Sequence, residues 1–159
     1  MTSSSSVSEE MVMLTSDQQR ILSLVLNMIV PPSPQRKLPG AADINFLEFL
    51  QTRATDIVPE IRRELDQLEL LAKKQFACAF VTLQEQQRQS LVDEVRKLEP
   101  NFMNRLALET VTCYYEHPGV LAALEIEDRP PYPEGHQVIA GDLMLLQPVR
   151  KRGKIYRDA

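Results

Sequence analysis

The sequence predicts an all-α fold, a helical bundle of about five helices followed by a long irregular C-terminal arm. Apolar residues recur at steps of three and four, prolines and capping residues divide these stretches, and no stretch of useful length alternates as a strand does. The 159 residues, 43% of them hydrophobic, are enough for one domain with a single core. We expect a leader over residues 1–13, the bundle over residues 14–125 and the arm over residues 126–159.

The N-terminal residues predict a disordered leader and then a first helix. Residues 1–13 are polar and rich in serine, which is typical of disorder. Thr15 and Ser16 each have a glutamine three residues later, at Gln18 and Gln19, which is the spacing of a capping box, the reciprocal hydrogen-bonding pattern found at helix starts. The apolar stripe of this helix comprises Ile21, Val25 and Met28. Pro31 and Pro32 end it, and the PPSPQRKLPGA stretch predicts a loop.

Two aspartates are the predicted caps of the second and third helices. Asp43 precedes a short apolar stretch that begins near Phe46. Asp56 precedes the longest stretch, in which Pro59 falls in the first turn, where its missing N–H costs nothing. The apolar stripe of this third helix comprises Ile61, Leu65, Leu68, Ala72, Phe76 and Ala79.

Two further helices complete the predicted bundle. Thr82 and Glu85 give a capping-box pattern for the fourth, whose buried stripe comprises Leu91, Val92, Val95 and Leu98. Pro100 starts the fifth, whose stripe comprises Phe102, Leu106, Thr110, Cys113 and Tyr114. This helix should end near Glu116, because the residue before Pro118 disfavours helical geometry. A short helical turn through VLAAL should follow.

The arm keeps large apolar side chains without helical periodicity. They are Tyr132, Val138, Ile139, Leu143, Leu145, Leu146, Ile155 and Tyr156. A disordered segment would not carry so many, and a segment of this length without its own structure is unusual inside a compact domain. We therefore expect these side chains to be buried against a surface, either this bundle or another chain. Stretches such as RPPYP favour an extended conformation that loses little entropy on docking.

Charge is distributed unevenly along the chain. Through Gln147 there are 13 basic residues against 21 acidic ones, a net of −8, whereas the last twelve residues carry +4. An acidic body repels phosphate, and the basic tip has little aromatic interleaving, so nucleic acid is not an expected partner. The tip, which includes Arg150 and Arg152, is either a solvated tail or a docking element for an acidic surface.

The two cysteines, Cys78 and Cys113, are too far apart for a CxxC pair and too few for a metal quartet. Each lies among apolar residues, which favours buried thiols, with one disulfide as the alternative. The N-terminus lacks the basic start and apolar run of a secretory signal, and the apolar run over residues 21–30 is too short to span a bilayer. We expect a cytoplasmic protein as written, without membrane insertion, or a periplasmic one if a partner carries it out.

No constellation of catalytic residues is apparent. His117 falls at a predicted helix end, where an imidazole most often caps the last carbonyls. The sequence contains neither of the common glycine-rich phosphate motifs. Four glutamates lie largely outside the apolar stripes and should be solvated: Glu64, Glu69, Glu94 and Glu99. We therefore expect no catalytic, cofactor or metal site in this chain. A small enzyme that uses Glu116 and His117 is the alternative.

The C-terminal third of the sequence resembles the gluconate 2-dehydrogenase subunit 3 family. The run from CYYEHPGVLAALEIEDRPPYPEGHQV into GDLMLLQPVRKRGKIYRDA contains an aromatic pair, a Leu-rich turn after a proline and a Pro-rich stretch with an aromatic. The matching residues are Tyr114, Tyr115, Pro118, Leu121, Leu124, Pro130, Pro131 and Tyr132. The N-terminal half is more loosely similar, through the LTSDQQRILSLVLNMIVPP helix and the PGA element at residues 39–41.

The resemblance implies a small, non-catalytic subunit of a dehydrogenase that oxidises sugars, sugar acids or glycosides. Its partner would be a large FAD-binding subunit of the glucose-methanol-choline type, often with a cytochrome c subunit that accepts the electrons. Many members begin with a twin-arginine export signal, which this sequence lacks. The expected partner interface comprises Tyr115, His117, Pro130, Pro131, Tyr132, Leu143, Leu145, Leu146, Arg150, Arg152, Ile155 and Tyr156. A free-standing helical binding or regulatory protein, with the arm packed on its own bundle, is the other hypothesis.

Overall fold

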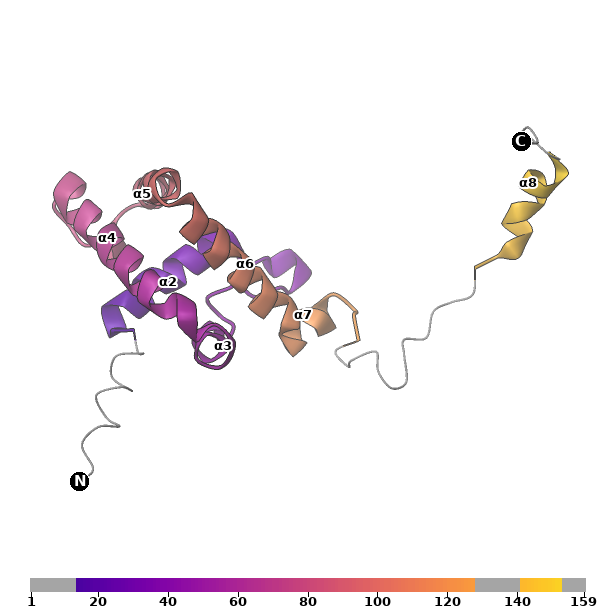
Figure 1. Ribbon diagram of the computed structural model, residues 1–159, viewed down its shortest axis with the longest axis horizontal. Coiled ribbons are helices and arrows are strands. Elements are labelled where there is room, and N and C mark those ends of the chain that lie inside the picture. The colour runs from indigo at the N-terminus through magenta and orange to yellow at the C-terminus, as the bar shows by residue number, and fades with distance from the viewer. Residues whose placement is uncertain (1–13, 128–140, 153–159) are drawn as a thin grey trace, which may run out of the picture. The chain divides into compact units, whose positions relative to one another are not determined.

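The computed structural model of the chain describes residues 14–127 and 141–152, which Figure 1 draws as coloured ribbons. The first range belongs to one compact unit and the second to another. Helices are the regular elements of both, and neither range contains a strand beyond an isolated bridge between Ser33 and Leu38. The predicted all-α class is therefore confirmed.

Residues 14–127 contain five helices of eight residues or more and a shorter sixth, as expected from the sequence. They are α2 (Ser16–Ile29), α3 (Phe46–Arg53), α4 (Val58–Phe76), α5 (Glu85–Leu98), α6 (Pro100–Glu116) and α7 (Pro118–Ala123). Single 3-10 turns precede α3, α4 and α5 at Pro34–Arg36, Thr55–Ile57 and Phe80–Thr82. The α7 helix is the short turn predicted after the fifth helix.

Local sequence patterns placed the starts of three helices correctly. The backbone N–H of Gln18 donates to Thr15 Oγ1 at 3.3 Å, and the N–H of Thr15 donates to Gln18 Oε1 at 3.0 Å, so the capping box of α2 is confirmed. Pro100 and Pro118 are the first residues of α6 and α7. A proline fits there because the first helical N–H has no partner within the helix.

The two aspartates predicted as caps have other partners. The α4 helix begins at Val58, and the carboxylate of Asp56 instead accepts a hydrogen bond from the Arg105 guanidinium of α6. That bond lowers the pKa of the Asp56 carboxyl. Asp43 Oδ2 accepts from the backbone N–H of Gly40 at 3.0 Å, and α3 begins three residues later. For Asp56, the charged guanidinium is a stronger donor than the backbone N–H groups at the start of the helix. For Asp43, the N–H of a neighbouring loop residue is a nearer donor.

The capping box of α5 lies two residues beyond the predicted one. Gln84 and Gln87 form it, with the backbone N–H of Gln84 donating to Gln87 Oε1 at 3.0 Å. The predicted cap, Thr82, donates its hydroxyl to the carbonyl of Ala79 at 2.7 Å within the preceding 3-10 turn. That bond supports the turn, so the helix starts later than the pairing of Thr82 with Glu85 predicted.

The predicted stripe of α4 is too long at its C-terminal end. The helix stops at Phe76 because Ala77 adopts a left-handed conformation, with φ at 55°. Ala79 therefore lies outside the helix, contrary to the prediction. Phe80 is fully buried instead, and its backbone N–H donates to Glu69 Oε2 at 2.9 Å.

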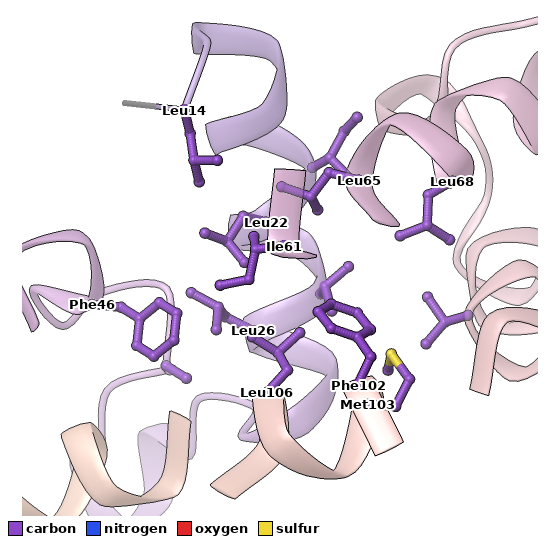
Figure 2. Packing of buried hydrophobic residues seen from close by; sticks show 14 of the residues in the cluster. Leu14, Leu22, Leu26, Phe46, Ile61, Leu65, Leu68, Phe102, Met103 and Leu106 are labelled. Carbon is purple, nitrogen blue, oxygen red and sulfur yellow. The ribbon is translucent and has the colours of Figure 1, made fainter. Parts of the chain in front are cut away.

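The core of the first unit lies where α2, α4 and α6 meet. Figure 2 shows Leu22 and Leu26 of α2 beside Ile61 of α4 and Leu106 of α6, with Phe46 of α3 on the same cluster. A buried side chain of this size contributes about 1.5–3 kcal/mol relative to an exposed one. Packing of amphipathic faces, rather than intrinsic helix propensity, therefore supplies most of the stability.

Residues 141–152 form a 3-10 turn, Leu143–Leu146, that runs into the short helix α8 (Gln147–Lys151). The sequence predicted no regular structure here. Asp142 caps the turn, accepting from the backbone N–H of Met144 at 2.8 Å through Oδ1, and Pro148 lies in the first turn of α8. These local groups stabilise about two turns, which are too short to produce a helical period in the sequence.

Candidate protein–protein interface

The adjacent tyrosines of α6 have opposite roles. Tyr114 is 2% exposed, and its hydroxyl donates to the carbonyl oxygen of Pro39 at 2.8 Å. Tyr115 is 52% exposed, and its ring meets that of Tyr114 edge to face with centroids 5.4 Å apart. Neighbouring residues of a helix point about 100° apart, so one faces the core while the other faces solvent. Tyr114 is therefore buried, as its place in the predicted stripe of the fifth helix required, and the exposed Tyr115 remains a predicted interface residue.

Tyr114 secures the loop that contains the PGA element. The N–H of Ala41 donates to the carbonyl of Val30 at 3.0 Å, and the N–H of Ala42 donates to Asn27 Oδ1 at 3.0 Å. A Cβ at Gly40 would lie 2.3 Å from Asn27 Oδ1, so only glycine allows this close approach. The loop is thereby held between the end of α2 and the last turns of α6.

Tyr115 belongs to an exposed apolar stripe along α6. Leu108, Val111 and Tyr115 follow steps of three and four, and all three are exposed, Leu108 to 64%. The buried residues Phe102, Leu106, Thr110, Cys113 and Tyr114 occupy the opposite side of the same helix. A helix with apolar residues on its solvent side presents a surface suited to another protein. Leu108 and Val111 were not predicted as interface residues, although their helical spacing from Tyr115 can be read in the sequence.

His117 joins α6 to α7 through its backbone rather than its side chain. Its N–H donates to the carbonyl of Tyr114 at 3.2 Å, and its carbonyl accepts from Val120 and Leu121. The imidazole Nδ1 is buried and has no hydrogen-bond partner among the described residues. The prediction that this imidazole caps the last carbonyls is therefore wrong at Nδ1, since the backbone makes the connection.

Glu116, one of the two residues of the small-enzyme alternative, forms an ion pair with an arginine. The Glu116 carboxylate accepts from Arg53 Nη1 of α3 at 2.5 Å, in an exposed ion pair between α3 and α6. Cys113 is a free, buried thiol, and desolvation together with Glu116 raises its pKa to about 11. A thiol with that pKa stays protonated at neutral pH and is a poor nucleophile.

Residues 141–152 carry a second set of exposed apolar side chains. The predicted residues Leu143, Leu145 and Leu146 are exposed, and so are Met144 and Val149, which were not predicted as interface residues. Arg150 and Arg152 are exposed beside them. Five other predicted interface residues lie outside the described ranges: Pro130, Pro131, Tyr132, Ile155 and Tyr156.

Other kinds of site find little support in residues 14–127 and 141–152. No group of three His, Cys, Asp or Glu side chains there is arranged to hold a metal ion. The helices in these ranges are also too short or too polar to cross a membrane. Both cysteines are free thiols, Cys113 buried and Cys78 partly so. The predicted disulfide alternative is therefore wrong.

Comparison with known proteins identifies the family. A family model described as Gluconate 2-dehydrogenase subunit 3 matches residues 16–125, from the start of α2 to just past α7. No curated protein and no solved structure matches the chain. The match ends before residues 126–159, although much of the resemblance noted in the sequence lies there. It covers the greater part of the sequence, so the chain belongs to the gluconate 2-dehydrogenase subunit 3 family.

Proposed function

We propose that this chain is an accessory subunit that binds and stabilises the large subunit of a dehydrogenase complex. The observation that carries the proposal is the exposed stripe of Leu108, Val111 and Tyr115, in a chain whose family is named for one subunit of gluconate 2-dehydrogenase. Exposed apolar side chains at helical spacing favour association with another chain.

The proposed partner is an FAD-dependent flavoprotein of the glucose-methanol-choline type that oxidises a sugar, a sugar acid or a glycoside. The flavin belongs to that subunit, and a cytochrome c subunit that accepts the electrons is a further proposed component. The resemblance in the sequence and the family name support this assignment. The pairing of Glu116 with Arg53 and the protonated thiol of Cys113 favour a role without catalysis.

Two surfaces would contribute to binding. One is the α6 stripe, and the other is the set of exposed apolar residues in 143–149. Each large apolar side chain contributes about 1.5–3 kcal/mol when it is fully buried, offset by the cost of ordering the chain. Arg150 and Arg152 are expected to affect the association rate and its salt dependence more than the final affinity.

Co-expression with a tagged large flavoprotein subunit from the same genome tests the proposal. Leu108→Asp should weaken co-purification by at least about tenfold, because a charge would be buried where an apolar group packed. Leu70→Asp on α4 is the matched control, since Leu70 is 59% exposed and Leu108 is 64% exposed. Circular dichroism should show both variants as helical as the parent.

Three results would contradict the proposal. They are equal effects of the two substitutions, a monomeric chain that never co-purifies with the flavoprotein, and bound flavin or dehydrogenase activity in the isolated chain. A stable monomer without a partner would favour the free-standing binding protein instead.

A further inference from the structure

A cleft of about 200 Å³ lies between α4 and the C-terminal end of α5, away from the α6 stripe. Its lining combines charged and apolar side chains: Arg63, Glu64, Gln67, Val95, Leu98 and Glu99. Leu98 was predicted to be buried in the stripe of the fourth helix, but it lies at the end of α5 and is 63% exposed, so the cleft presents an uncovered aliphatic wall to solvent.

Glu64 is a buried carboxylate in this lining. The sequence predicted a solvated surface position, but the residue is only 4% exposed. Its other side faces the core, where a small apolar void is lined by Glu64 together with Leu65, Val92 and Phe102. A charge in such surroundings is costly unless a cation or hydrogen-bond donors compensate it.

Arg63 compensates Glu64 from an exposed position. Its Nε donates to Glu64 Oε1 at 2.8 Å, and the Arg63 side chain is 63% exposed. The hydrogen bond and charge of Glu64, with smaller contributions from Glu99 and Glu60, raise the pKa of the guanidinium. Two carboxylates and one guanidinium therefore line the cleft, which leaves it with an excess of negative charge.

We propose that this cleft receives the side chain of an arginine or lysine from a partner protein. The aliphatic stem would lie against the exposed side chain of Leu98, and the cationic head would lie beside Glu99, with the buried carboxylate of Glu64 adding to the negative charge of the cleft. A basic side chain fits because it combines an apolar stem with a charged end, and the cleft combines an apolar wall with acidic groups. The identity of the partner as the large subunit rests on the proposed function, whereas the ligand chemistry does not.

The lining argues against other ligands. An anion would meet two carboxylates, and a bare metal ion would find only Glu64 and Glu99 as charged ligands, with Arg63 beside them. A purely apolar group would leave the Glu64 carboxylate without a second cation.

A titration of the full chain, followed by heteronuclear NMR, tests the ligand chemistry. N-acetyl-argininamide and N-acetyl-lysinamide should shift the amide signals of residues 63–67 and 95–99. N-acetyl-norleucinamide, which has an aliphatic stem without the charge, should bind at least fivefold more weakly. Glu99→Gln and Glu64→Gln should each weaken binding of the basic probes about fivefold. Glu94→Gln is the matched control on α5, because Glu94 bonds Gln75 and does not line the cleft.

The proposal is overturned if the basic probes cause no shifts in the cleft, if the norleucine probe binds equally well, or if Glu94→Gln weakens binding as much as Glu99→Gln. Glu99 is exposed, so its variant keeps the test decisive even if Glu64→Gln does not fold.

The same variants then test whether a partner supplies the side chain. In the co-purified complex with the large flavoprotein subunit, Glu99→Gln should lower the salt concentration at which half of the complex dissociates, and Glu94→Gln should not. If the probes bind but Glu99→Gln leaves that salt concentration unchanged, the cleft does not bind the large subunit and the partner assignment is overturned. The proposal that the chain is a subunit of the complex is then unaffected. Failure to assemble with any large subunit, with probe binding intact, would instead refute the proposed function.

Discussion

Tyr114 is buried and hydrogen-bonded, whereas Tyr115 is exposed. Substitutions at these two positions should therefore have separate effects, on the free energy of unfolding at Tyr114 and on partner binding at Tyr115. Tyr114→Phe removes one hydroxyl and leaves the ring in place, so it tests only the bond to the Pro39 carbonyl, which measures 2.8 Å. Tyr115→Phe removes the same atom from an exposed ring on the same helix and is the matched control.

The magnitude follows from burial at both ends of the bond. Tyr114 is 2% exposed, and desolvation raises the pKa of its hydroxyl, so water does not readily replace Tyr114 at the Pro39 carbonyl. A buried acceptor that loses its donor costs about 1–3 kcal/mol, and Pro39 is partly buried, which places the expected loss at about 1–2 kcal/mol. Tyr115→Phe should change the free energy of unfolding by less than about 0.5 kcal/mol.

Urea unfolding and thermal melts, both followed by circular dichroism, measure the difference. Tyr114→Phe should lower the midpoint temperature by about 3–6 °C for each kcal/mol lost, with an unchanged urea m-value. Well below that midpoint it should still bind the large subunit as the parent does, whereas Tyr115→Ala should bind more weakly. Equal stabilities of Tyr114→Phe and Tyr115→Phe would refute the inference that Tyr114 secures the PGA loop.

Three further predictions concern the arm, the thiol and the histidine. Truncation after Glu125 should leave the helical bundle folded by circular dichroism but abolish co-purification with the large subunit; unfolding of the bundle would show that the arm belongs to its core. The Cys113 thiol, whose pKa is about 11 against an ordinary 9.0, keeps its proton in the folded state over a range where the unfolded chain releases it. The free energy of unfolding should therefore fall by about 1–3 kcal/mol as pH rises from about 9 to about 11, and urea titrations of Cys113→Ala should lack that component. His117→Ala should leave turnover of the assembled complex within about threefold, because general acid–base catalysis contributes on the order of 100-fold, and a loss of that size would revive the enzyme hypothesis.

Helix positions were largely readable from the sequence because they depend on groups a few residues apart. The reciprocal bonds of Thr15 and Gln18, and the prolines at the starts of α6 and α7, are interactions within a single helix start. The apolar stripes likewise predicted most of the buried positions, since a 3.6-residue period needs no knowledge of the neighbouring helix. Leu98 is an exception, because it was predicted to be buried and is 63% exposed.

Other positions were decided by residues distant in the sequence. Asp56 is not the N-cap of α4, and its carboxylate accepts a hydrogen bond from Arg105, 49 residues away. Glu64 looked like a surface residue, but the packing of α5 and α6 against α4 buries it and leaves Arg63 to compensate its charge. Polar side chains with several available partners are not fixed by their own neighbours in sequence, because the best partner appears only when the helices pack.

Some residues of the candidate interface were likewise predicted from the sequence, and others were found only in the tertiary structure. The sequence marked Tyr115 and the leucines of 143–146 as apolar groups that need a surface to bury them, because their side chains are large, and Tyr115 also matches the aromatic pair of the family. The tertiary structure confirmed that Tyr114 is buried and showed that Tyr115 is exposed, and it alone added Leu108 and Val111. Apolar residues surround much of α6, so periodicity alone gives two plausible faces. The packing of α6 against α2, α3, α4 and α5 covers one of them and leaves the other to solvent.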